Sequence, residues 1–211
     1  DSEKCNLEKS TIRLKREHIE DIKHLFDLMG VGYIHNDVGE AEAYAAELCR
    51  MGYVHAVVTE DMDTLAYGCP RIIRGCLDRT IKRNDVVSCI SYDKIIEGFG
   101  MDHDQFVDVC ILCGCDYCPT IPKIGPIRAH QYITNYKTIE AMIESNKFKI
   151  SNEFQERYLK SRELFQIFQN KIDLESLPLH KSDRRMGQLR DYLHKDCGLS
   201  VKKVENALRK I

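Results

Sequence analysis

The feature that most constrains the fold is a short run of β-branched and apolar residues, Val54–Val58 (VHAVV), which leads directly into the acidic segment TEDMD. A run this apolar fits a strand that is buried on both faces of a parallel sheet. The preceding residues 40–51 (EAEAYAAELCRM) are rich in strong helix formers and end at Gly52. With a strand candidate at Val31–Ile34, the sequence predicts a strand, a helix and a strand joined as one right-handed crossover unit.

The chain changes character near Ile121. Before that point, further short strands are expected at Pro70–Ile73 and Asp85–Ile90, around a charged loop at 77–85 that we interpret as a solvated turn. After it the pattern favours helices alone. Helices are expected at residues 14–28, 40–51, 93–99, 104–112, 127–135, 138–145, 153–169 and 201–210. The sequence therefore predicts an α/β half followed by an all-helical half.

Bulk composition limits the classes of protein that fit. The 211 residues are 43% hydrophobic and 30% charged, which suits a globular domain with a substantial core. No apolar run approaches the length of a membrane span, and the opening DSEKCNLEKS is too polar for a signal peptide, so no membrane partner is expected. The formal net charge of −2 gives no global signal for nucleic acid, so a DNA site would have to be local.

Ten cysteines without a secretory signal favour reduced thiols over a disulfide framework. Cys110, Cys113, Cys115 and Cys118 form two C-x-x-C pairs separated by a single residue, which leaves the chain little room to wrap around zinc. The preferred interpretation is that Cys110 and Cys113 lie on the buried side of a helix.

Three acidic groups fall at the ends of the predicted α/β elements, and they comprise Glu40, Glu42, Asp61, Asp63 and Asp116. Loops beyond the carboxyl ends of parallel strands converge, so these carboxylates are expected at one rim of the sheet. Gathered there, they would repel one another unless hard cations sat among them. Oxygen-only ligands suit Mg²⁺ or Mn²⁺, and a pair of such ions is the usual device for phosphodiester cleavage.

Each acidic group alone has a simpler explanation, because acidic residues favour the first turn of a helix and acidic pairs are common on solvated surfaces. No rival catalytic arrangement is evident, however. The sequence contains no Walker-type phosphate loop and no recognisable Ser/His/Asp or Cys/His nucleophile pattern.

A second signal is IPKIGPIRAHQYI, residues 121–133. A tight turn at Gly125 and Pro126 that leads into a helix leaves backbone N–H groups free, and a phosphate can bind there whatever the base sequence. The simpler interpretation is that this segment is an ordinary helix start. The position of the segment shortly after Asp116 favours the hypothesis that it binds phosphate.

Four segments in this order and spacing resemble flap endonucleases, within the wider family of xeroderma pigmentosum group G and Rad2-type 5′ nucleases. They are GEAEAYAAEL (39–48), VVTEDMDTLAYG (57–68), QFVDVCILCGCDYC (105–118) and IPKIGPIRA (121–129). The resemblance implies a PIN-like α/β nuclease core in residues 1–116. Residues 117–211 would then form a helical region with a helix-two-turn-helix element, similar to a SAM fold, that grips duplex DNA.

The resemblance also implies roles for individual residues. Glu40, Glu42, Asp61, Asp63 and Asp116 correspond to ligands of two Mg²⁺ ions, for which Mn²⁺ can substitute. Glu40, Gly114 and Asp116 lie where the family contacts DNA. The turn from Thr120 through Lys123 to Gly125 matches a site for phosphate and a monovalent cation such as K⁺, and Arg128 matches a basic residue of the following helix.

The sequence departs from the family pattern at the turn and before residue 1. Pro122 and Lys123 stand where a basic residue and a glycine are common, and Ile127 replaces a common lysine. A non-glycine residue at 123 would strain the turn if its φ must be positive. The chain opens without Met, and the family's N-terminal ligands and helical gateway have no counterpart, so we expect a truncated fragment with little activity. A clamp-binding motif that would recruit a sliding clamp is also not found.

These observations favour a structure-specific 5′ flap endonuclease, or a 5′–3′ exonuclease of the same family, that acts on branched or flapped duplex DNA. One alternative is a non-catalytic DNA-binding scaffold, and another is a PIN-type ribonuclease, which the helical half makes less suitable. The expected location is the nucleus, or a viral replication site if the source is viral.

Overall fold

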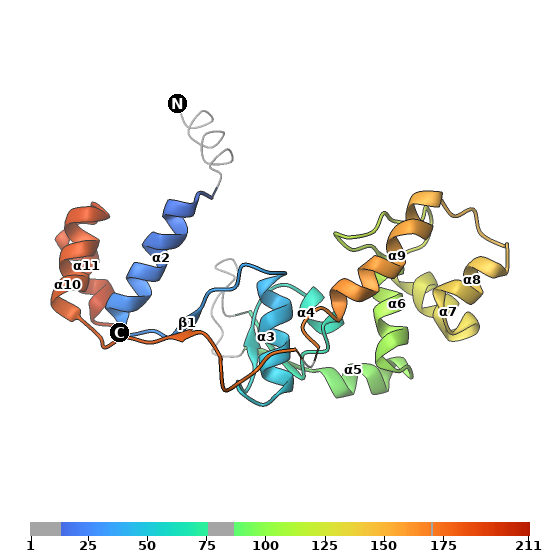
Figure 1. Cartoon of the computed structure of the whole chain (residues 1–211), viewed down its shortest axis with the longest axis horizontal. Helices are drawn as coiled ribbons and strands as arrows, with labels where there is room; N and C mark the ends of the chain where they lie inside the picture. Colours follow the sequence, from blue (N-terminus) through green and yellow to red (C-terminus); the bar gives the residue numbers. More distant parts are fainter. Residues whose placement is uncertain (1–13, 76–86, 170) are drawn as a thin grey trace, which may run out of the picture. The chain divides into compact units, whose positions relative to one another are not determined.

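The computed structural model describes residues 14–75, 87–169 and 171–211, and it divides into two compact units (Figure 1). The terminal unit joins the described residues up to His35 with Leu177–Ile211. The central unit is Asn36–Ser176. No helix within the described ranges is both long and apolar enough to cross a membrane.

The terminal unit is built from the two ends of the chain. Its elements are α2 (Arg16–Met29), β1 (Tyr33–Ile34), β5 (Leu179–His180), α10 (Met186–Asp191), the π-helical turn η1 (Tyr192–Asp196) and α11 (Val201–Leu208). Leu28 of α2 packs in one small core with Leu189, Val204 and Leu208. The predicted helix 14–28 is confirmed, and it ends at Gly30, whose left-handed φ of 68° suits glycine.

The predicted crossover unit is wrong. Tyr33 and Ile34 of β1 pair antiparallel with His180 and Leu179 of β5, and not with the strand at Val57. Only two residues of each strand pair, so the pairing left little trace in the hydrophobic pattern. For the same reason the expectation that no strand follows Ile121 is also wrong.

The sheet of the central unit holds three strands in the order β2 (Val57–Val58), β3 (Arg71–Arg74) and β4 (Ser88–Ser91). β2 and β3 run parallel, whereas β3 and β4 run antiparallel. Val57 is buried but Val58 is 49% exposed, so the expected burial on both faces is wrong. The loop at 77–85 and the first residues of the strand expected at 85–90 lie outside the described residues.

Seven helices complete the described part of the central unit. They are α3 (Ala41–Arg50), α4 (Asp63–Ala66), α5 (Tyr92–Phe99), α6 (His103–Cys113), α7 (Pro126–Tyr136), α8 (Ile139–Glu144) and α9 (Asn152–Phe165). Six of them confirm predicted helices, whereas the single turn α4 was not predicted. α6 begins at a capping box in which Asp102 and Gln105 satisfy each other's backbone N–H groups.

Helix α6 is the axis of the central unit. Its residues Val107, Ile111 and Leu112 are almost completely buried, and α6 packs against both α7 and α9 (Figure 1). The predicted division into functional regions 1–116 and 117–211 stays a prediction. The boundary between compact units lies elsewhere, because α6 and the helices that follow it share one core.

A charged network ties α6, α8 and α9 together. Arg162 of α9 donates to both carboxylate oxygens of Asp108 at 2.6 and 2.7 Å, and to those of Glu140 at 2.6 and 2.9 Å. Asp108 also accepts the backbone N–H of Ile139, the first residue of α8, at 3.1 Å. The Asp108 side chain is only 4% exposed, so its charge depends on these donors in place of water.

Replacing Arg162 with Met should destabilise the protein by about 3 kcal/mol, because a buried carboxylate would lose its cation. Chemical denaturation followed by circular dichroism measures this change. The control is Arg157→Met, which breaks the exposed pair with Glu153 and should cost less than about 1 kcal/mol. Equal losses in the two variants would contradict a structural role for the network.

The same network should make stability depend on pH. The hydrogen bonds from Arg162 lower the pKa of Glu140 from its ordinary 4.5 to about 2. A carboxyl group whose pKa is lower in the folded state contributes stability above pH 4.5 and loses it as pH falls towards 2. The stability difference between the wild type and Glu140→Gln should therefore be largest at neutral pH and shrink across this window. A difference that stays constant from pH 6 to pH 2 would show that this ionisation is not linked to folding.

Candidate metal centre and nucleic-acid interface

Asp61 and Asp63 lie at the carboxyl end of β2, where a compact turn fixes both. The backbone N–H of Asp61 donates to the Thr59 hydroxyl at 3.0 Å, and that of Asp63 donates to the Asp61 carboxylate at 2.9 Å. Asp63 is the first residue of α4, whose N-terminus favours negative charge. Asp61 is exposed and Asp63 is half-buried, so one carboxylate faces water and the other faces the protein.

Glu40 and Glu42 lie at the start of α3. Glu40 is the N-cap residue, with an extended backbone and an exposed side chain, and Glu42 lies in the first turn and is half-buried. Ala43 and Ala46 bury the opposite side of the helix in the core. The small buried residues anchor α3 while its acidic end stays accessible.

Asp116 follows α6 in a tight loop and is exposed. The pKa of Asp63 is raised, first by burial and then by the negative charges of Asp61, Asp116 and Glu42. Glu40 in turn acts together with Asp63 on the pKa values of Tyr67 and Tyr117. Four of the predicted carboxylates therefore lie within electrostatic range of one another around Asp63, and Glu40 shares two tyrosine neighbours with Asp63. The assignment of all five as metal ligands stays a prediction.

The chemistry of this acidic rim, defined as Glu40, Glu42, Asp61, Asp63 and Asp116, suits a hard cation. None of the five carboxylates forms an ion pair with any residue that the structure describes, so their mutual repulsion is not neutralised from within this part of the chain. Oxygen donors match Mg²⁺ and Mn²⁺. Within the described residues, no three His, Cys, Asp or Glu side chains are gathered closely enough to hold a metal ion.

Two tyrosines that the sequence analysis missed lie beside the rim. The hydroxyls of Tyr67 and Tyr117 share a hydrogen bond of 2.7 Å. Burial raises the pKa of both phenols, and the negative charges of Glu40 and Asp63 raise it further. Both groups therefore stay protonated at neutral pH and keep a hydrogen available for bonding. Nothing in the sequence distinguishes them from other aromatic residues, because they are 50 positions apart.

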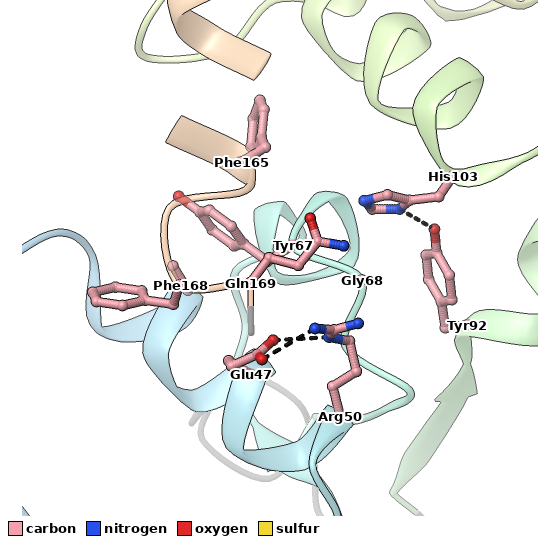
Figure 2. Close-up of a pocket in the computed structure, with 10 residues that line it drawn as sticks. Glu47, Arg50, Tyr67, Gly68, Tyr92, His103, Phe165, Phe168 and Gln169 are labelled. Atoms are coloured by element: carbon pink, nitrogen blue, oxygen red, sulfur yellow. Dashed lines mark hydrogen bonds and ion pairs between the residues drawn. The ribbon is translucent and has the colours of Figure 1, made fainter. Parts of the chain in front are cut away.

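Tyr67 also forms one wall of a pocket of about 230 Å³ (Figure 2). Glu47 and Arg50 are joined there by two hydrogen bonds of 2.8 and 3.0 Å. Across the pocket His103 bonds the Tyr92 hydroxyl at 2.6 Å, and burial lowers the pKa of His103, which favours its neutral form. The first pair lies within α3, and the second joins the first residue of α5 to the first residue of α6.

Three of the four clustered cysteines, Cys110, Cys113 and Cys118, have pKa values that burial raises above the ordinary value. Cys110 and Cys113 are half-buried and pack against the core, which agrees with the predicted buried side of a helix. Burial raises the pKa of Cys110 to about 12 and that of Cys118 to about 11. Their packing against the core favours a structural role for Cys110 and Cys113.

The loop after α6 requires glycine at position 114. Gly114 has a φ of 108°, and a Cβ atom there would lie 2.7 Å from Cγ2 of Thr120. Thr120, which was predicted to contact DNA, therefore packs against Gly114. The close approach brings Asp116 and the following turn into one short segment.

The turn at 121–124 holds Lys123 in the left-handed region. The N–H of Ile124 donates to the carbonyl of Ile121 at 3.1 Å, and Lys123 has a φ of 69°. Proline at the second position and a positive φ at the third are typical of a type II turn, which normally takes glycine at the third. The predicted strain at Lys123 is confirmed. Arg128 reaches back and donates to the Lys123 carbonyl at 2.8 Å.

The start of α7 is open to an anion. Gly125 is its N-cap residue and Pro126 its first residue, and no side chain caps the helix. The side chains of Lys123 and Arg128 are both exposed. Two cations next to uncapped N–H groups can bind a phosphate without reading bases, as the sequence predicted for Gly125.

Comparison with known proteins identifies relatives that match most of the chain. A family model of the XPG I-region matches residues 30–116. Flap endonuclease 1 of Debaryomyces hansenii is 35% identical over 211 residues, which cover 97% of this chain and 54% of the relative. Flap endonuclease 1 of Talaromyces stipitatus is 42% identical over 161 residues, which cover 74% of this chain and 40% of the relative. The chain spans about half the length of the curated relatives it matches.

Solved structures confirm the predicted fold class. Flap endonuclease-1 from Methanococcus jannaschii superposes with a TM-score of 0.71 at 23% identity, over 93% of this chain and 57% of that one. The catalytic core of Rad2 in complex with DNA substrate gives 0.72 at 18% identity, over 92% and 69% of the two chains. At these identities the likeness shows a shared fold, an α/β nuclease core followed by a helical region.

Replacing Lys123 with Gly should stabilise the protein by about 0.5–1 kcal/mol, because glycine adopts a positive φ without the cost that other residues incur. It should also weaken binding to duplex DNA, since one exposed cation is lost. Thermal unfolding and fluorescence anisotropy with a labelled duplex measure the two effects. The matched control is Lys123→Ala, which removes the same charge but keeps the strain. If Ala and Gly stabilise the protein equally, the turn is not strained.

Proposed function

We propose that the protein hydrolyses DNA phosphodiester bonds at junctions between single and double strands. The chain belongs to the flap endonuclease family of the xeroderma pigmentosum group G and Rad2 type, and this membership supports the proposal. The relatives at 35–42% identity are named flap endonuclease 1, which favours 5′ flaps as the substrate. The observation that carries the proposal is the acidic rim itself. Asp63 is repelled by Asp61 in the same turn and by Glu42 and Asp116 from elsewhere in the chain. A helix start without a side-chain cap, where an anion can bind, follows shortly after Asp116.

The proposed cofactor is a pair of Mg²⁺ ions, with Mn²⁺ as a substitute. One solved relative, the junction-resolving enzyme GEN1, is named with product DNA, Mg²⁺ and Mn²⁺. Asp61, Asp63 and Asp116 would hold the cations, with Glu40 and Glu42 completing the set from α3. Divalent cations bound in this way supply an activated water and stabilise the leaving oxygen.

The chain's own residues position the substrate. The uncapped start of α7 with Lys123 and Arg128 would bind a backbone phosphate of the duplex, since it offers N–H donors and positive charge. Gly114 keeps the segment carrying Asp116 close to Thr120, so that one short stretch of chain links the acidic rim to the phosphate site. Because these contacts are to phosphate, the protein should recognise the shape of the DNA and not its base sequence.

DNA is the proposed partner, and its branched form is the finer part of the proposal. Rad2 and GEN1 are each named in complex with DNA, GEN1 with a Holliday junction. Flap cleavage, exonucleolytic digestion and binding alone differ in which substrates are consumed. A panel of substrates therefore separates them.

The test measures Mg²⁺-dependent cleavage of end-labelled 5′-flap, blunt and single-stranded DNA. The longest product encoded by the gene should be used beside the 211-residue chain, so that activity is not missed for want of further sequence. Asp61→Asn and Asp116→Asn should each lower cleavage at least about 100-fold, because a lost ligand costs more than a lost outer contact. Binding to the flap should persist in both variants.

The matched control is Asp93→Asn, an exposed acidic residue at the start of α5 that lies outside the acidic rim. It should cleave at the wild-type rate. Blunt-end digestion without junction cleavage would identify an exonuclease of the same family. Tight flap binding without Mg²⁺-dependent cleavage of any substrate would overturn the enzyme assignment and leave a DNA-binding scaffold.

A further inference from the structure

The hydrogen bond between Tyr67 and Tyr117 joins the two segments that carry Asp63 and Asp116. Tyr67 ends α4, the single helical turn that begins at Asp63, and its backbone N–H donates to the Asp63 carbonyl at 3.2 Å. Tyr117 directly follows Asp116 in the chain. The two hydroxyls therefore link the two carboxylates through one helical turn on one side and one peptide bond on the other.

A third ring holds both tyrosines in place. Phe165, near the end of α9, lies with its ring centre 5.2 Å from that of Tyr67 and 5.6 Å from that of Tyr117. Figure 2 shows Phe165 beside Tyr67 at the pocket wall. Phe165 is 3% exposed and Tyr67 is 9% exposed, so these rings belong to the core. Packing of this kind restricts the phenol rotamers and leaves the hydroxyls little freedom to part.

The loop that carries Tyr117 is itself short and braced. Cys115 and Cys118 form an isolated antiparallel bridge, in which the N–H of Cys118 donates to the Cys115 carbonyl at 3.4 Å. Asp116 and Tyr117 are the two residues between them. A movement of Tyr117 would therefore also move the backbone of Asp116.

Electrostatic repulsion works against this arrangement. Asp63 and Asp116 carry like charges, and neither forms an ion pair with a described residue. Repulsion alone would move the exposed Asp116 away, because its side chain forms no hydrogen bond or ion pair with the part of the chain that the structure describes. A hydrogen bond in surroundings of low dielectric is strong enough to oppose such a movement.

We infer that Tyr67 and Tyr117 are positioning residues that fix the separation of Asp63 and Asp116 for binding a divalent cation. The inference rests on the proposed function only in taking these carboxylates as ligands. It places a new determinant of metal affinity outside the ligand set, in the packing between α4, the 115–118 loop and α9.

The test uses Tyr67→Phe and Tyr117→Phe, which remove one hydroxyl each and keep the rings against Phe165. Binding of Mn²⁺, measured by isothermal titration calorimetry, should weaken roughly 3- to 10-fold in each variant, as expected for one hydrogen bond. The double variant should be no weaker than either single variant, because both remove the same bond. Under limiting Mg²⁺ the kcat for flap cleavage should fall while the KM for DNA stays unchanged.

The matched control is Tyr92→Phe. It also removes a phenol hydrogen bond, to His103 at 2.6 Å, within the same unit but away from the acidic rim. It should unfold at a temperature similar to that of Tyr67→Phe and bind Mn²⁺ like the wild type. Wild-type Mn²⁺ affinity in both Tyr67→Phe and Tyr117→Phe, or an equal loss of affinity in Tyr92→Phe, would overturn the inference. If the wild type cleaves no DNA but Tyr67→Phe and Tyr117→Phe still lose Mn²⁺ affinity, the proposed function fails and the positioning role stands.

Discussion

The ion pair between Asp108 and Arg162 is the constraint on which the central unit depends. A carboxylate buried in the middle of α6 needs a cation at fixed geometry. If α6 and α9 slid past each other, the Asp108 carboxylate would lose its ion pair with Arg162 or become exposed to water. The C-terminal end of α6 leads through Gly114 to Asp116, and the end of α9 supplies Phe165 to the paired tyrosines. An interaction with no chemical role of its own therefore sets where the chemical groups stand.

Much of this organisation could be read from the sequence because it is local. Helical periodicity identified α2 and every helix of the central unit except the short α4, and Gly30 marked the end of α2. The acidic residues stood out because each group directly follows or opens a predicted element. Strain at Lys123 was expected, should its φ be positive, because a glycine is common at this position in the family that the sequence resembles.

What the sequence did not reveal is non-local. β1 pairs with β5 across the whole central unit through only two residues each, and the apolar pattern cannot show which strands meet. Arg162 looked like any other charge on the polar face of a helix, and its two carboxylate partners come from other helices. The link between Tyr67 and Tyr117 becomes apparent only in the fold, which brings their hydroxyls into hydrogen-bonding distance. The acidic residues predicted to bind metal were visible in the sequence, whereas the residues that hold their segments in place were not.

The pairing of β1 with β5 makes the central unit an insertion within the terminal unit. The chain leaves the terminal unit after His35 and returns at Leu177, so the small core around Leu28 and Leu189 must close a very long loop. Closing a disordered loop of that length carries an entropic cost, which falls once the intervening residues are already compact. The terminal unit is therefore expected to assemble last during folding, and its stability should report on whether the central unit has formed.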